Sequence, residues 1–96
     1  MTIWTLSPEA ADDLDRLVEF LLEDWPLAAT ATVDMVVDAL QILAQHPEIG
    51  RPVAHGLREL VISRGKSGYL ALYDYDEQHD LVIMLALRHQ REAGYR

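Results

Sequence analysis

Two helical patterns meet at Trp25 and Pro26 with almost no residues between them, and this junction constrains the fold more than any other feature. The first pattern opens at Ser7-Pro8-Glu9, where a capping serine, a proline at the first helical position and an acidic residue favour a helix start. Its apolar residues recur at three- and four-residue steps: Leu14, Leu17, Val18, Leu21, Leu22 and Trp25. We expect an amphipathic helix over residues 8–24, with Asp12 and Asp13 on its solvated side.

The second helix is expected to begin at Pro26, because proline ends one helix and fits the first position of another. It runs to about Gln45 with one apolar face, made of Ala29, Val33, Val36, Val37, Leu40, Leu43 and Ala44. Two helices without a loop must fold back as a hairpin on a common core. A further face is small and weakly polar, and a partner could cover it: Ala28, Ala31, Thr32, Met35, Ala39 and Ile42.

One short β-prone segment precedes the hairpin and three longer ones follow it. The expected strands are 3–6, 57–64, 69–75 and 81–88, with irregular chain over 46–56, a four-residue hairpin loop at 65–68 and a turn at 77–80. The last strand opens with seven consecutive apolar residues, typical of a strand buried on both faces. The sequence therefore predicts a single α+β domain over residues 1–96, in the order β-α-α-β-β-β. Its helical hairpin packs on one face of a mainly antiparallel sheet, and the pairing of the first strand is left open.

Charge is distributed unevenly along the chain, whose formal net charge is −8. Residues 1–50 contain ten acidic residues against Arg16 alone, whereas residues 51–96 contain seven basic and six acidic residues. Such a chain repels nucleic acid at long range, which argues against direct nucleic-acid binding, although a local basic patch can act at short range. Without cysteine, a leader-like N-terminus or an apolar run of membrane-spanning length, we expect a cytoplasmic protein that does not enter membranes.

Metal and phosphate-loop chemistry find little support. The histidines, His46, His55, His79 and His89, are scattered over loops and a strand end, without cysteine or a helical His-x-x-x-His pair. The stretch Gly65-Lys66-Ser67-Gly68 lacks the upstream glycine and the following helix of a phosphate-binding loop. The sequence therefore predicts no metal site and no cofactor.

Cationic residues gather where strands of the second half end. In a meander, the end of the last strand lies beside the turn between the first two. Arg64, Lys66, Arg88, His89 and Arg91 can therefore converge on one rim, with Arg58 at the opposite end and Tyr95 in the tail. Such a rim could bind phosphate, act as acid, base and charge stabiliser in phosphodiester cleavage, or bind acidic groups of a protein. Plain packing or surface roles for His89 and Tyr95 are the alternative.

Five segments, in this order and spacing, resemble the RelE/ParE superfamily, the toxin halves of bacterial toxin–antitoxin pairs. They cover nearly the whole chain: Leu6-Ser7-Pro8-Glu9-Ala10, His46-Pro47-Glu48-Ile49-Gly50-Arg51-Pro52, Gly56-Leu57-Arg58-Glu59-Leu60, Tyr73-Asp74-Tyr75 and Arg88-His89-Gln90-Arg91-Glu92-Ala93-Gly94-Tyr95. The Pro-Glu-Ile-Gly-Arg-Pro loop and the tail are similar to the ParE branch, also called plasmid stabilisation proteins.

The resemblance implies a toxin held inactive, in a hetero-oligomer, by the C-terminal segment of a cognate ParD-like antitoxin. It implies DNA gyrase as the target for the ParE branch, and mRNA cleavage on the ribosome for RelE-like relatives. Arg58 matches the family's arginine at the entry to the second strand, and Arg91 and Tyr95 match basic and aromatic positions near the C-terminus. The chain departs from the lysine-rich character of the ribonucleases, which favours gyrase inhibition by protein contact without hydrolysis.

Three hypotheses follow for the site. In the favoured one, antitoxin and target contact Met35 and the cationic residues together with Tyr95. In the second, the chain is an mRNA interferase whose catalytic residues are Arg64, Arg88, His89, Arg91 and Tyr95. In the third, it is a non-toxic module that only binds its partner.

Overall fold

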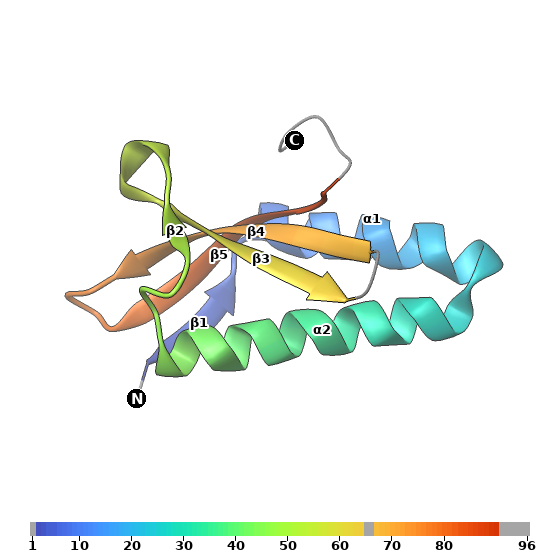
Figure 1. Cartoon of the computed structure of the whole chain (residues 1–96), viewed down its shortest axis with the longest axis horizontal. Coiled ribbons are helices and arrows are strands. Elements are labelled where there is room, and N and C mark those ends of the chain that lie inside the picture. The colour runs from blue at the N-terminus through green and yellow to red at the C-terminus, as the bar shows by residue number, and fades with distance from the viewer. Residues whose placement is uncertain (1, 65–66, 91–96) are drawn as a thin grey trace.

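The computed structural model describes residues 2–64 and 67–90, and it places one helical hairpin against one sheet (Figure 1). The elements follow in the order β1 (Ile3–Leu6), α1 (Pro8–Asp24), α2 (Pro26–Gln45), β2 (Arg51–Pro52), the 3₁₀ helix η1 (Ala54–Gly56), β3 (Arg58–Arg64), β4 (Ser67–Asp76) and β5 (Leu81–His89). The α+β class is confirmed, and the helix bounds agree with the sequence pattern. The short strand β2 and the helix η1 were not predicted, because a proline-rich stretch carries no strand periodicity.

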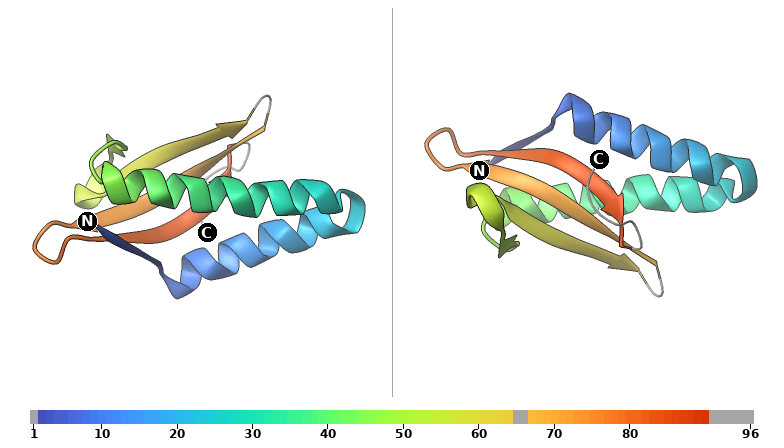
Figure 2. Two further views of the ribbon diagram at one scale, coloured as in Figure 1. Left: turned by 90° about the horizontal axis from the view of Figure 1, so that it is seen from below. Right: turned by 90° about the horizontal axis from the view of Figure 1, so that it is seen from above.

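The sheet has the strand order β1-β5-β4-β3-β2. The first strand, whose pairing the sequence left open, runs parallel to β5, while the other neighbours are antiparallel. Both helices cover the same face of the sheet, as the two side views show (Figure 2). Strand β3 reaches Arg64 and pairs it with Ser67, so the predicted four-residue hairpin loop is too long.

The core lies between the hairpin and the sheet. Val36, Leu40 and Leu43 of α2 are at most 1% exposed, and they face Tyr73 of β4 and Met84 of β5, which are equally buried. Burying side chains of this size contributes about 1.5–3 kcal/mol each. The pattern therefore identified these three buried positions of α2, whereas Val37, predicted on the same face, is 38% exposed.

Helix α1 differs from its predicted pattern at both ends. Asp13 was expected in solvent, yet it is only 7% exposed. Its carboxylate accepts a hydrogen bond from the backbone amide of Leu87 on β5. Leu22 and Trp25 were expected in the core, yet they are 53% and 59% exposed. The far end of the hairpin extends past the sheet, which leaves these side chains without a surface to pack on (Figure 2).

Strand β5 is buried on one face and only partly covered on the other, which corrects the prediction of two buried faces. Val82, Met84 and Leu87 are buried, whereas Ile83 and Leu85 are half-buried. Leu85 is the extra residue of a β-bulge, since β4 pairs Leu72 and Tyr73 with Ala86 and Met84 and skips it. The bulge turns Leu87 back toward the helices.

Helix α2 is long and apolar enough, by length and composition alone, to cross a membrane. The core helix of a soluble protein passes the same test, and here the apolar residues Val36, Leu40 and Leu43 lie against the sheet. The sequence-based statement that no run approaches spanning length was therefore too strong.

Candidate functional site

Strand pairing places three of the expected cationic positions at one end of the sheet. Arg64 pairs with Ser67 at the end of β3, and Arg88 and His89 pair with Leu70 and Tyr69 near the start of β4. Lys66, Arg91 and Tyr95, which the sequence placed on the same rim, lie outside the described residues. The described part of this candidate rim therefore consists of the backbone at Arg64 and the side chains of Arg88 and His89.

Arg88 and His89 point to opposite faces of the sheet, because successive residues of a strand alternate. His89 lies on the helix side, where its ring meets that of Tyr69 edge-on, with 5.4 Å between centroids and planes 86° apart. The Tyr69 hydroxyl is in turn hydrogen-bonded to the hydroxyl of Thr32 on α2, at 3.2 Å. Arg88 is half-buried beside the buried Leu70, on the face of the sheet opposite the helices.

Arg58 lies at the opposite end of the sheet, where its guanidinium holds a loop. It donates to the carbonyl oxygens of Gly50 and Glu48 at 2.8 and 3.0 Å, between the end of α2 and β2. The neighbouring Tyr73 hydroxyl donates to Pro47 at 2.8 Å and accepts from the Gly50 amide at 2.9 Å. Gly50 is required there, since a Cβ would lie 2.6 Å from Cε1 of Tyr73.

Met35, the other predicted contact, is half-buried and packs against the core between hairpin and sheet. The predicted weakly polar face of α2 is used in part inside the molecule, because Thr32 and Ala39 are both 4% exposed. Ile42, at 47%, is the exposed large side chain of that face. Two of the six residues of this face are therefore buried, three are half-buried and one is exposed.

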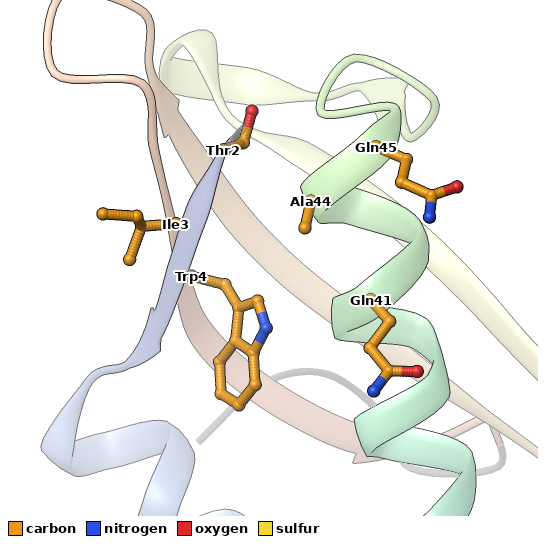
Figure 3. A pocket seen from close by; sticks show the side chains of 6 residues that line it. All are labelled: Thr2, Ile3, Trp4, Gln41, Ala44 and Gln45. Atoms are coloured by element: carbon orange, nitrogen blue, oxygen red, sulfur yellow. The ribbon is translucent and has the colours of Figure 1, made fainter.

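Two hollows that sequence reasoning missed lie around the C-terminal end of α2. The first, of about 500 Å³, separates α2 from the start of the chain and is lined by Thr2, Ile3, Trp4, Gln41, Ala44 and Gln45 (Figure 3). The second, of about 550 Å³, is lined by Gln45, His46, Pro47, Glu48, Ile49 and Tyr75. The two share Gln45. The sequence contained one signal for the first hollow, since the strand Ile3–Leu6 carries no charged residue. The position of the hollow could not be predicted, because the pairing of this strand could not be derived from the sequence.

A polar cluster beside the first hollow ties the two parallel strands together where both begin. The hydroxyls of Thr2 and Tyr75 both donate to Oδ1 of Asp80, at 2.7 and 2.9 Å. These two bonds hold the pKa of Asp80 below its usual value, and the same carboxylate raises the pKa of Tyr75. In the adjacent turn, hydrogen bonds from His79 lower the pKa of Asp76.

No three His, Asp or Glu side chains among the described residues lie close enough to hold a metal ion.

Residues 5–94 match the family described as the ParE toxin of the type II toxin–antitoxin system parDE. The chain belongs to this family of toxins. It is 36% identical over 87 residues to Toxin RelE3 of Caulobacter vibrioides, which covers 91% of this chain and 92% of the relative. It is 35% identical over 68 residues to Toxin RelE1 of the same organism, covering 71% and 73% of the two chains.

Solved structures agree on the fold of this ParE-family toxin. A chain of the chromosomal ParDE system of P. aeruginosa superposes with a TM-score of 0.72 at 22% identity, covering 93% of this chain and 96% of that one. A chain of the toxin–antitoxin complex RelBE2 of Mycobacterium tuberculosis gives 0.61 at 25% identity, covering 93% and 98%. The family match and the sequence relatives establish a type II toxin, and because both ParE and RelE occur among the names, they do not establish its target.

Proposed function

We propose that this ParE-family toxin inhibits DNA gyrase by protein contact and is neutralised by the C-terminal segment of a cognate antitoxin. One observation favours this function over ribonuclease activity: the side chains of Arg88 and His89 point in opposite directions. These two side chains leave β5 on opposite faces of the sheet.

Cleavage of a phosphodiester needs an acid, a base and a charge stabiliser within hydrogen-bond reach of one phosphate. His89 contacts Tyr69 on the helix side, while Arg88 is on the opposite face of the sheet. Arg58 is at the far end of the sheet and is engaged with loop carbonyls. The described residues thus offer no such trio, and the net charge of −8 adds repulsion toward RNA. Inhibition by protein contact requires neither three catalytic groups around one phosphate nor attraction to RNA.

Exposed apolar side chains support a protein partner. Phe20 and Trp25 are 67% and 59% exposed and Leu27 is 87% exposed, all around the tip of the hairpin. Exposed apolar side chains of this size can serve as contact points for a partner. The structural neighbours named as toxin–antitoxin complexes fit such an assembly. We propose a hetero-oligomer of toxin and antitoxin in the cytoplasm.

Induced expression in a bacterial host, followed by a supercoiling assay with the purified chain and gyrase, tests this function. The expected result is DNA-damage signalling, filamentous cells and inhibition of supercoiling, all relieved by co-expression of the antitoxin. His89→Gln should reduce this activity only in part, because glutamine keeps a hydrogen-bonding group for contact and inhibition by contact requires no proton transfer by the imidazole. Arrest of translation with cleaved mRNA, and its loss in His89→Gln, would contradict the proposal.

The RelE names of both curated relatives favour one alternative, an mRNA interferase. The same induction separates the two, since mRNA is cut within minutes in one case and supercoiling fails in the other. Growth unaffected by expression, with an intact fold, would indicate the third possibility, a module that binds its partner without toxicity.

A further inference from the structure

The loop of residues 46–50, between α2 and β2, is fixed by hydrogen bonds to its backbone. The Tyr73 hydroxyl joins the carbonyl of Pro47 to the amide of Gly50, at 2.8 and 2.9 Å. The guanidinium of Arg58 binds two further carbonyl groups of the same stretch. The backbone of this loop is therefore already ordered in the toxin alone.

The side chains of Glu48 and Ile49, in contrast, are exposed on this fixed loop. Ile49 is 54% exposed, and Glu48 is exposed as well. No lysine or arginine side chain that the structure describes forms an ion pair with the Glu48 carboxylate. A rigid backbone that presents an apolar and an acidic side chain suits binding, because little conformational entropy is lost when a partner docks.

The second hollow, of about 550 Å³, opens beside these two side chains. Its wall combines Gln45 at the end of α2, the loop residues 46–49 and Tyr75 of β4. The end of α2 and the turn between β4 and β5 lie at the same end of the molecule (Figure 1). Arg88 and His89 pair with the start of β4, so this hollow is at the opposite end of the sheet from the candidate rim.

The electrostatics of this hollow favour a cation. Helix α2 has no basic residue in its last turn, so its own side chains leave the negative end of the helix dipole uncompensated. The wall adds the carboxylate of Glu48 and contains no lysine or arginine. Tyr75 contributes an aromatic side chain, a group that also attracts cations. A guanidinium fits this combination best, since it pairs with carboxylates and stacks on aromatic rings.

We propose that the target of the toxin binds at this surface, with an arginine of the target entering the second hollow toward Glu48 and an apolar neighbour covering Ile49. The inference rests on the proposed function, because it names the part of the toxin through which that target is bound. The target meets the toxin after the antitoxin has left, so its binding surface has to be formed in the toxin alone. The negative charge excludes nucleic acid and selects a basic protein segment.

Arg58 supports the loop but is not part of this contact. Its guanidinium is bonded to loop carbonyls, and its side chain does not line the hollow. The two bonds of the Tyr73 hydroxyl remain when Arg58 is replaced, so the surface persists in such a variant.

Supercoiling by purified gyrase, measured at rising toxin concentrations, tests this surface. Glu48→Arg and Ile49→Ser should each raise the concentration for half inhibition about tenfold or more. The matched controls lie on exposed positions of α2 outside the hollow: Asp38→Arg introduces the same charge in place of an acid, and Ile42→Ser removes an isoleucine that is 47% exposed. Each control should shift the concentration less than threefold. Circular dichroism verifies that all four variants are folded.

Titration of each variant with the cognate antitoxin shows which partner uses the surface. Glu48→Arg and Ile49→Ser should bind the antitoxin within threefold of the wild-type affinity. If both variants inhibit gyrase as well as the controls do, the inference is overturned while the proposed function stands. An equal loss of antitoxin binding also overturns the inference, because the surface then belongs to the antitoxin. A wild-type toxin that leaves supercoiling unaffected overturns the proposed function and, with it, this assignment.

Discussion

The carboxylate of Asp13 on α1 accepts a hydrogen bond from the backbone amide of Leu87 on β5, with 3.0 Å between oxygen and nitrogen. β1 ends at Leu6, so within residues 2–64 and 67–90 no strand pairs with the edge of β5 beyond Met84. The Ser7 hydroxyl donates to the carbonyl of Leu85 at 3.1 Å on the same edge. Side chains from the start of α1 thus replace a missing strand.

Removing this carboxylate should destabilise the protein, because the Leu87 amide would stay buried without an acceptor. We expect Asp13→Ala to lower the free energy of unfolding by about 1.5–3 kcal/mol, the range for bonds to charged groups. Asp12→Ala, at an exposed neighbouring position, should change it by less than about 0.5 kcal/mol. Urea unfolding of both variants measures the difference, and equal effects would show that the Asp13 bond contributes little.

The burial of Asp13 could not be predicted from the sequence, in contrast to the helices. The bounds of both helices followed from caps, prolines and periodicity, because these signals are local. The burial of Asp13 depends on where β1 stops along β5, which is a tertiary fact. The exposure of Leu22 and Trp25 is likewise a tertiary fact, because their apolar pattern could not show that the hairpin extends past the sheet.

The candidate rim was predictable in its position but not in its geometry. The order of the strands was enough to bring Arg64, Arg88 and His89 to one end. The opposite directions of Arg88 and His89 follow from the period of two, yet their contacts required the pairing with β4. Arg58 was noted as a family position, whereas its bonds to loop carbonyls depend on the fold of residues 46–52.

We expect folded variants of Arg58 to keep their toxicity. Its guanidinium binds the carbonyls of Glu48 and Gly50, so Arg58→Met should lower stability by about 1 kcal/mol through these lost bonds. Circular dichroism at the assay temperature shows how much variant is folded, and growth after induction reports toxicity. A variant that is fully folded yet harmless would place Arg58 in the target contact instead.

Tyr73→Phe should remove a buried anchor of the same loop. The substitution leaves the Gly50 amide and the Pro47 carbonyl without a protein partner, which costs about 1–3 kcal/mol. Tyr75→Phe is the control, because its hydroxyl bonds to Asp80 at the surface and should matter less. Thermal unfolding of both variants gives the comparison, and a larger loss at Tyr75 would contradict it.

The hydroxyl of Tyr73 should also make the stability of the protein depend on pH in the alkaline range. Burial raises the pKa of Tyr73 above the usual 10.0, although the bond from Gly50 and the charge of Arg58 oppose this. The folded state therefore keeps its proton when the unfolded state loses it, so the contribution is complete below pH 10 and is lost as the pH rises through the folded pKa. The stability difference between wild type and Tyr73→Phe should narrow as the pH rises above 10. An unchanged difference would refute this origin.

Thr2→Val should raise the pKa of Asp80 toward its ordinary value of 3.8, because the Thr2 hydroxyl is the largest cause of its depression. A carboxylate with a lowered folded pKa stabilises the protein above the unfolded pKa, and this contribution disappears as the pH falls through the folded pKa. The variant should consequently lose less stability on acidification. Titration of the carboxyl carbons by NMR measures the shift, with Asp76 as internal reference, since its depressed pKa derives from His79. If the Asp80 pKa stays low in Thr2→Val, the Tyr75 hydroxyl alone holds it, and the link between the starts of β1 and β5 is weaker than the 2.7 Å bond indicates.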